Sequence, residues 1–255
     1  MNPVWKGGIS FGLVYLPVKL YSGTEQHKVP LDMIREGDKC PIKYVRVCRD
    51  DGEEVPWEKI IKGYKTDGHY VELKDEDFEK IDMKRSQNIE IIDFVSIDEI
   101  SPRYFTKPYL VEPDKESYKV YNLLREAIHK SGKVGITKFV MRSREILAVL
   151  MADEKVLYIN QLRFSDEVRS ADKLDIPEEK KPKKEELDLA LKIIEGMNDI
   201  FHPDKYKDTY REKLMEIIEA KKEDRKPETP KPKNKRKTKE EDLLKKLKQS
   251  LDMVN

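Results

Sequence analysis

Short runs of alternating apolar and polar residues fill most of the first 166 positions, and this pattern constrains the fold more than any other feature of the sequence. Alternation with a period of two is typical of β-strands that bury one face. It predicts strands at 9–21, 42–49, 69–73, 89–97, 109–112, 134–151 and 155–164. We therefore expect an α+β, mainly β fold, most simply a barrel or a sandwich.

Two of these runs carry further detail. In the first run, the residues expected on one face are Ile9, Phe11, Leu13 and Tyr15. Pro17 suits a bulge or an edge, because proline cannot donate a hydrogen bond to a neighbouring strand. The run at 42–49 is followed by Asp51–Gly52, a pair that is typical of a hairpin turn.

The sequence predicts helices in four further places. A helix at 115–130 would bury the face that carries Tyr121, Leu124 and Ile128. A shorter helix is expected at 75–82, with Asp75 capping its first turn. Later in the chain, 184–201 and 210–222 each show a single apolar stripe, so both helices need a partner surface.

These patterns divide the chain into four parts. A strand-rich domain occupies 1–180, and a helical arm occupies 181–222. The segment 223–239 is basic and proline-rich without a large apolar side chain, so it predicts a disordered linker. At 240–255 an amphipathic helix follows, which is typical of a docking peptide but equally consistent with a helix that folds back on its own protein. Its candidate docking residues are Leu243, Leu244, Leu247 and Leu251.

The net charge of +1 conceals an uneven distribution of a large number of charged residues, which make up 40% of the chain. Residues 1–50 hold 8 Lys/Arg and 5 Asp/Glu, 51–100 hold 7 and 15, and 101–150 hold 10 and 5. Residues 221–255 hold 13 and 7. A fold that turned the basic blocks toward one surface would bind a polyanion. A solvated surface of mixed sign is the simpler alternative.

Basic residues interleave with strand-forming ones in 137–150, TKFVMRSREILAVL. Their even spacing places Lys138, Arg142 and Arg144 on one face of the predicted strand. Cationic side chains on a rigid backbone suit contact with phosphates, independent of base sequence. We take nine residues as candidate phosphate contacts, although ordinary solvation also accounts for each lysine: Lys138, Arg142, Arg144, Lys43, Arg49, Lys62, Lys65, Lys6 and Lys19.

Motifs for catalysis and cofactor binding are absent from the sequence. It contains neither a phosphate-binding P-loop nor a dinucleotide-binding glycine motif. Cys40 and Cys48 lie eight residues apart without a second pair, whereas a zinc site needs four ligands. An acidic group would suit a two-metal nuclease, but a solvated helix face is simpler: Asp75, Glu76, Asp77, Glu79 and Asp82. We predict that the chain is not an enzyme and binds no cofactor or metal.

The sequence also indicates where the protein resides. It has no apolar run of about 18 residues, so we expect no membrane span, and its N-terminus lacks the pattern of a secretory signal. Two cysteines exclude a disulfide scaffold and fit a reducing compartment. We therefore expect a soluble, cytoplasmic protein.

The opening WKGGISFGLVYLPVKLYS (5–22) resembles the start of the bacterial Ku proteins. Together with further matches in the expected order, the resemblance spans roughly 4–222. The final helix is similar to the short leucine-bearing C-terminus of many bacterial Ku chains. The further matches lie at 47–64, 94–113, 123–128, 137–150, 162–169 and 197–221.

The resemblance implies a homodimer of β-barrels whose long strands arch into bridges and close a ring around duplex DNA. It also implies sequence-independent binding of double-stranded DNA ends at the bacterial nucleoid, and recruitment of an ATP-dependent DNA ligase, ligase D, in non-homologous end joining. By position 137–150 matches the bridge, so Lys138, Arg142 and Arg144 are the leading DNA-binding candidates. The alternatives are a metal-dependent nuclease and a DNA-packaging protein with no preference for ends.

Overall fold

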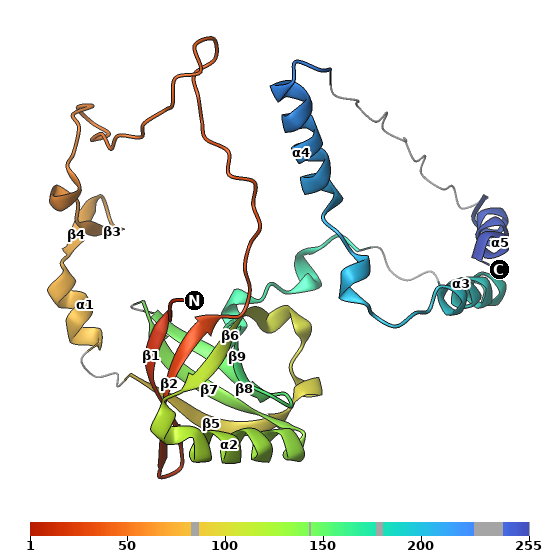
Figure 1. Cartoon of the computed structure of the whole chain (residues 1–255), viewed down its shortest axis with the longest axis horizontal. Helices are drawn as coiled ribbons and strands as arrows, with labels where there is room; N and C mark the ends of the chain where they lie inside the picture. The colour runs from red at the N-terminus through yellow and green to blue at the C-terminus, as the bar shows by residue number, and fades with distance from the viewer. Residues whose placement is uncertain (83–86, 143, 177–180, 227–241, 255) are drawn as a thin grey trace. The chain divides into compact units, whose positions relative to one another are not determined.

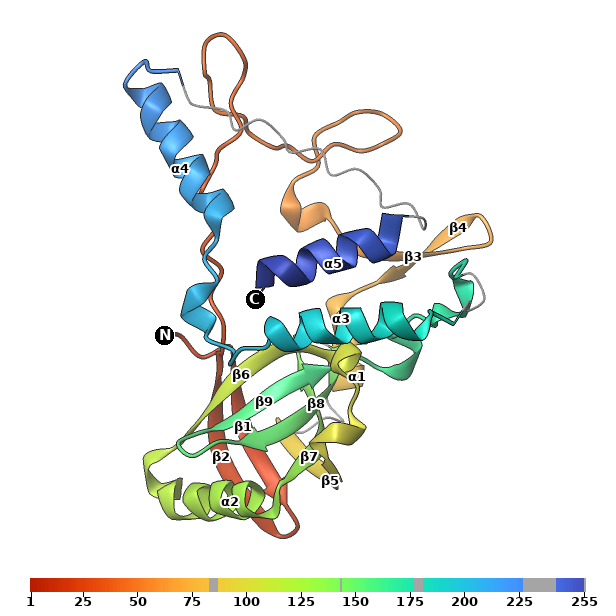
Figure 2. The same ribbon diagram turned by 90° about the vertical axis from the view of Figure 1, so that its right-hand side faces the viewer.

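The structure is a computed structural model that describes residues 1–82, 87–142, 144–176, 181–226 and 242–254. The chain divides into two compact units, Met1–Ala171 and Asp172–Asn255, and Figures 1 and 2 show the elements of both. No helix in the described ranges is long and apolar enough to cross a membrane.

The first unit is built on a closed barrel, in which the strands of the described chain follow the order β1-β2-β6-β9-β8-β7-β5. Neighbouring strands are antiparallel except for β1 and β5, which are parallel. The expectation of a mainly β fold is thereby confirmed, in the form of a barrel. Its strands are β1 (Trp5–Phe11), β2 (Val14–Ser22), β5 (Asn88–Ser96), β6 (Phe105–Pro113), β7 (Lys133–Met141), β8 (Arg144–Ala152) and β9 (Leu157–Leu162).

The barrel interior holds the main hydrophobic core, and helix α2 (Tyr118–Ser131) packs against it. The face of α2 that enters the core carries Tyr121, Leu124 and Ile128, as the helical spacing predicted. The Tyr121 hydroxyl donates to the Val111 carbonyl (3.1 Å) and accepts from the Leu157 amide (2.8 Å). These bonds tie α2 to β6 and β9 and satisfy a buried phenol.

The strand predicted at 9–21 is wrong, because the chain reverses within it. Gly12 has φ 58°, a left-handed conformation that glycine adopts without strain, and β1 and β2 pair on either side of it. The expected face is therefore not formed; Ile9 is buried, whereas Phe11, Leu13 and Tyr15 are exposed. Pro17 pairs with Gly8 of β1. It lies one residue before Val18, where the ladder between β2 and β6 begins, so β6 needs no backbone hydrogen bond donated by Pro17.

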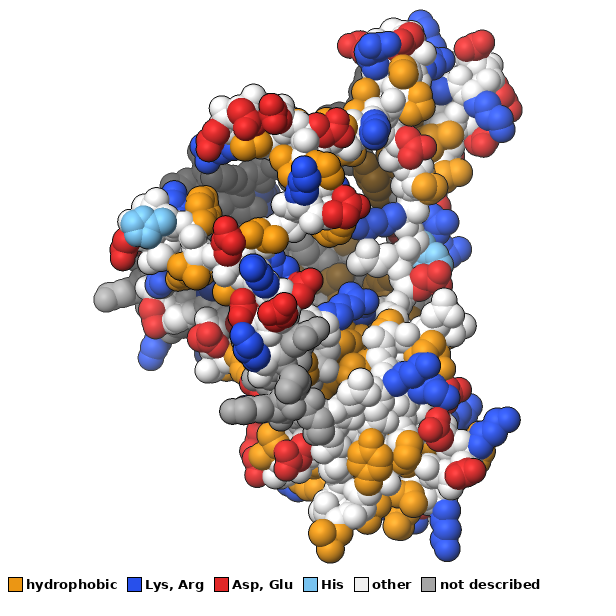
Figure 3. Space-filling model, turned by 90° about the vertical axis from the view of Figure 1, so that its left-hand side faces the viewer, with side chains coloured by type: hydrophobic (Ala, Val, Ile, Leu, Met, Phe, Trp, Pro, Cys, Tyr) orange, Lys and Arg blue, Asp and Glu red, His pale blue; other side chains and the backbone are white. Residues whose placement is uncertain are grey.

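Between β2 and β5 the chain leaves the barrel as a long excursion, which we call the 23–86 segment (Figure 1). Almost all of its described residues are exposed, and Figure 3 shows apolar side chains among charged ones on this side of the molecule. It contains β3 (Lys62–Thr66), β4 (His69–Leu73) and α1 (Asp75–Asp82), and β3 pairs with β4 in an antiparallel hairpin. The predicted strand at 69–73 and helix at 75–82 are confirmed.

Of the other predictions for the 23–86 segment, two are wrong and one is confirmed. Residues 42–49 form no strand, because the chain there makes only an isolated bridge from Val47 to Glu54. The reversal at Asp51–Gly52 is confirmed, since the Gly52 amide donates to the Cys48 carbonyl (3.0 Å). At the start of α1 it is Asp77, not Asp75, whose carboxylate accepts from a backbone amide, that of Lys74 (3.1 Å).

Two turns in the 23–86 segment, at 35–40 and 48–53, share one set of hydrogen bonds. In each, the amide of the fifth residue donates to the carbonyl of the first, and the amide of the first donates to the carbonyl of the sixth. An aspartate at the fourth position, Asp38 or Asp51, accepts from the amide of the sixth. The fifth residue has a positive φ in both turns. These local bonds order a stretch that has no core of its own.

The second unit consists of α3 (Lys184–Gly196), α4 (Thr209–Lys222) and α5 (Leu243–Val254). Helix α3 packs against α5, and a salt bridge of 3.2 Å joins Glu185 to Lys248. The predicted helix at 184–201 ends early, at Gly196, whereas the helix expected at 210–222 is confirmed. The helix expected at 240–255 is present as Leu243–Val254, and residues 240, 241 and 255 lie outside the described residues. The part of the expected linker at 223–239 beyond residue 226 lies outside the described residues.

Short 3-10 helices complete the described chain. They lie at Trp57–Lys59, Ile97–Glu99, Pro102–Tyr104, Lys115–Ser117, Ser165–Glu167, Ala171–Lys173 and Pro203–Lys205.

Candidate nucleic-acid interface

One end of the barrel, which we call the open end, is the end at which β2, β7 and β9 finish and β5, β6 and β8 begin. Both junctions with the 23–86 segment therefore lie there, together with the turn between β7 and β8. The Trp5 indole donates to the Val140 carbonyl (2.9 Å) and ties the start of β1 to the end of β7. Helix α2 follows β6 and precedes β7, so it lies at the opposite end.

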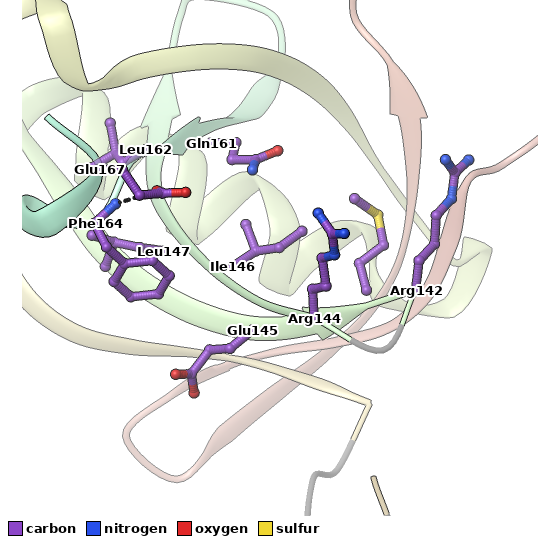
Figure 4. A pocket seen from close by; sticks show the side chains of 10 residues that line it. Arg142, Arg144, Glu145, Ile146, Leu147, Gln161, Leu162, Phe164 and Glu167 are labelled. Atoms are coloured by element: carbon purple, nitrogen blue, oxygen red, sulfur yellow. Dashed lines mark hydrogen bonds between the residues drawn. The ribbon is translucent and has the colours of Figure 1, made fainter. Parts of the chain in front are cut away.

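Arg142 and Arg144 lie at the open end, on either side of the tip of the β7–β8 hairpin. Both side chains are exposed, and neither forms an ion pair within the described part of the chain. Arg142 has φ 54°, a strained conformation for a residue with a side chain. Figure 4 shows the Arg144 side chain on the same side of β8 as Ile146, with Arg142 standing apart.

The Arg142 charge also acts on a buried phenol beside it. Burial raises the pKa of Tyr109, and the positive charge of Arg142 lowers it in part. The Lys107 ammonium lies 5.5 Å from the centre of the Tyr109 ring. Tyr109 thus lies within reach of two cations at the open end, Arg142 and Lys107, and the sequence prediction did not include Lys107.

The expectation that Lys138, Arg142 and Arg144 share one strand face is wrong, because the run at 134–151 is a hairpin and not one strand. Met141 pairs with Arg144 across the turn, and cross-strand partners lie on the same face. Lys138 instead lies on the other face of β7, exposed and opposite Glu90 of β5. These strands belong to the barrel, so the assignment of 137–150 to a bridge is also wrong.

Lys6 and Lys19 are direct partners in the β1–β2 ladder. Lys19 is bound to Asp114 at 3.1 Å, and the hydrogen bond with that carboxylate raises the pKa of Lys19. The charge of Lys19 is therefore offset within the barrel surface, and Lys6 is the more available cation of the pair.

The remaining candidates lie in the 23–86 segment, and all four are exposed: Lys43, Arg49, Lys62 and Lys65. The Lys62 ammonium lies 4.2 Å from the centre of the Phe78 ring. This contact connects β3 to α1. Arg46 is a further cation that the prediction missed, with its guanidinium 4.5 Å from the centre of the Trp57 ring. The sequence does contain a signal for this contact. Arg46 alternates with apolar residues, and a tryptophan, Trp57, follows further along the chain.

The 23–86 segment and the barrel from Ser10 onward lie within one recognisable family domain. A profile of the Ku70/Ku80 beta-barrel domain matches residues 10–189. The chain belongs to the Ku family. The non-homologous end joining protein Ku of Opitutus terrae is 41% identical over 223 residues, which cover 87% of this chain and 80% of the relative. The Bacillus subtilis protein of the same name is 38% identical over 228 residues, covering 88% and 73%.

The Ku relative of Mycolicibacterium smegmatis is 36% identical over 226 residues, which cover 87% of this chain and 71% of that one. The resemblance to bacterial Ku that was noted from 5–22 onward is thus confirmed. Every DNA-binding candidate except Lys6 lies within the matched Ku domain, as do Arg46 and Lys107.

The acidic group at 75–82 was the basis of the nuclease alternative for this Ku chain. Asp77 there accepts from the Lys74 amide and binds the Lys80 ammonium at 3.1 Å, and these contacts lower the pKa of Asp77. Among the described residues, no three His, Cys, Asp or Glu side chains are grouped to hold a metal ion. The side chains of Glu79 and Asp82 lie outside the description.

Proposed function

We propose that this Ku protein binds the ends of double-stranded DNA without regard to sequence, as a homodimer whose two subunits close a ring around the duplex. The ring protects and bridges the ends and recruits an ATP-dependent ligase of the ligase D type in non-homologous end joining. One observation carries the proposal: a long segment, 23–86, whose described residues are almost all exposed, leaves and rejoins the barrel at the end that also carries Arg142 and Arg144.

The length of the 23–86 segment is sufficient for a ring. Groove depths of about 8.5 and 7.5 Å imply a duplex roughly 20 Å across, so half its girth is about 30 Å. An extended chain gains about 3.3 Å per residue, so about ten residues per subunit span that distance. A two-fold pair encloses the cylinder with two equivalent arms. The segment therefore takes the bridging role that the sequence analysis gave to 137–150.

The apolar side chains of the 23–86 segment support the homodimer. Trp57 and Tyr64 are 66% and 67% exposed, and Leu31, Ile61 and Tyr70 are also exposed. Exposed apolar side chains that gather into a patch mark protein–protein interfaces. A second copy of the segment would cover these side chains with matching ones and leave the charged residues for DNA.

The first test of this function is the salt dependence of binding to a blunt, fluorescently labelled duplex. If the ring contacts about 6–10 phosphates, we expect affinity to fall by about 10³–10⁵-fold between 50 and 200 mM salt. Fluorescence anisotropy at several salt concentrations measures the slope, and duplexes of unrelated sequence should give the same curve. A flat curve, or curves that differ by sequence, would contradict phosphate-based binding.

A second test concerns the docking role of α5. Deleting 240–255 should leave DNA-end binding unchanged and weaken stimulation of the ligase several-fold, because the leucine face of α5 is lost. The structure packs this face against α3, with Leu244, Leu247 and Leu251 half-buried, so docking requires α5 to leave α3.

The matched control for this deletion changes the exposed side of α5, through Lys245→Ala and Gln249→Ala, and keeps every leucine. We expect it to stimulate the ligase normally. Equal stimulation by the truncated protein, measured as joined product from linear DNA, would count against a docking role for α5.

A further inference from the structure

The ladder between β8 and β9 stops short of the open end and leaves a hollow there. Its last pair is Leu147 with Leu162, whereas β8 continues along β7 to Arg144. After Leu162 the chain turns aside into the 3-10 helix at Ser165–Glu167. Between the diverging strands lies a hollow of about 490 Å³ (Figure 4). Its size falls in the range of sites for small organic ligands.

The residues that line the hollow include two arginines, two glutamates, one amide and several apolar side chains. Arg144, Ile146 and Gln161 line one side of it, and Leu147 and Phe164 line the other (Figure 4). A guanidinium binds phosphate oxygens in a fork, and an aromatic ring offers a face for stacking. An amide both donates and accepts hydrogen bonds, so it matches the edge of any base.

The two carboxylates near the hollow do not neutralise Arg144. The Glu167 carboxylate accepts from the Phe164 amide at 2.8 Å and is held at the start of its 3-10 helix. Figure 4 shows the Glu145 side chain on the opposite side of β8 from Arg144. Arg142, which follows the end of β7, also lines the hollow. Arg144 therefore faces the hollow beside apolar surface from Ile146, Leu147 and Phe164.

We propose that this hollow binds one unpaired nucleotide, supplied by the single-stranded overhang of a DNA end. Arg144 contacts its phosphate, Phe164 stacks on its base and Gln161 bonds the edge of the base. A paired base stays stacked in the duplex and does not enter, whereas an unpaired base is free to do so. The inference rests on the proposed DNA-end binding and adds to it a preference for overhangs over blunt ends.

The test compares the full-length dimer on three labelled duplexes of identical paired sequence: blunt, with one unpaired 3′ nucleotide and with one unpaired 5′ nucleotide. We expect at least one overhang to bind about 5- to 100-fold tighter than the blunt end, since stacking of one base contributes on that scale. A 2-aminopurine at the unpaired position should lose fluorescence when it stacks on Phe164.

Two variants, Phe164→Leu and Gln161→Leu, should remove the overhang advantage and leave blunt-end binding unchanged. Phe94→Leu is the matched control, since Phe94 is a partly exposed aromatic residue of β5 outside the hollow. Thermal unfolding of each variant identifies any loss of folding, and Gln161→Leu keeps the test valid if Phe164→Leu does not fold.

Thymidine 5′-monophosphate distinguishes an overhang from a free nucleotide as the occupant. Weak binding of this nucleotide, sensitive to Gln161→Leu and accompanied by an overhang advantage, supports the proposal. Binding of the free nucleotide without any overhang advantage would overturn it, as would overhangs that bind no better than blunt ends. Failure of blunt-end binding itself would instead count against the proposed function.

Discussion

Replacing Arg142 and Arg144 together with Glu should abolish DNA-end binding while the protein stays folded and dimeric. Each phosphate contact contributes a factor of about 8 to affinity at 0.1 M salt, because a condensed counterion is released. A dimer that loses two contacts in each subunit therefore loses at least about 10³-fold. The introduced carboxylates repel phosphates and add to this loss. Both residues are exposed at a hairpin tip, so the barrel core is not disturbed.

The matched control for the charge reversal is Lys115→Glu with Lys119→Glu. It makes the same change in net charge at exposed positions beside α2, at the barrel end opposite to the open end. We expect this control to bind almost normally. Anisotropy titrations give the affinities, and sedimentation velocity shows whether each variant is a dimer. If the Arg variant binds at moderate salt, Arg142 and Arg144 are not part of the DNA site.

The helix on the barrel was predictable from sequence, whereas the hairpins were not. Tyr121, Leu124 and Ile128 mark the buried face of α2 because helical spacing depends on neighbouring residues alone. The reversal that follows Met141 has no such local signal, since arginine is not a residue that favours a tight turn. Alternation continues through the turn, so two strands look like one.

The same hairpin explains why the candidate site was assembled incorrectly. Because Met141 and Arg144 are cross-strand partners, the even-numbered residues of β8 lie on the face of the odd-numbered residues of β7. Spacing along the sequence therefore cannot place Lys138 beside Arg144. Arg142 acts on Tyr109 only because the barrel brings the end of β7 near β6, and that proximity depends on the register of distant strands. Lys107, by contrast, contacts the Tyr109 ring from two residues away on the same strand.

In the 23–86 segment, alternation alone was insufficient to make a strand. Residues 42–49 have the pattern, but the structure gives them no neighbouring strand to pair with beyond one bridge at Val47. Lys43 and Arg49, both candidate phosphate contacts, are exposed there but do not lie in a strand. The length and exposure of the segment, rather than its secondary structure, are what the ring requires.

A ring that encloses DNA makes a second large prediction, which concerns topology rather than affinity. A closed ring loads only where the duplex stops, and once loaded it leaves only by way of an end. Blocking both ends after loading should therefore trap the protein, even at salt concentrations that weaken phosphate contacts by about 10³–10⁵-fold. A protein that lies against one side of the duplex has no such protection.

The most direct measurement is retention after a high-salt wash on two DNA molecules of identical sequence, one a covalently closed circle and one linear with its ends blocked after loading. We expect the linear DNA to keep the protein until a restriction enzyme opens it, and the circle to keep none. Equal retention on both, or equal loss from both, would show that no subunit pair encircles the duplex.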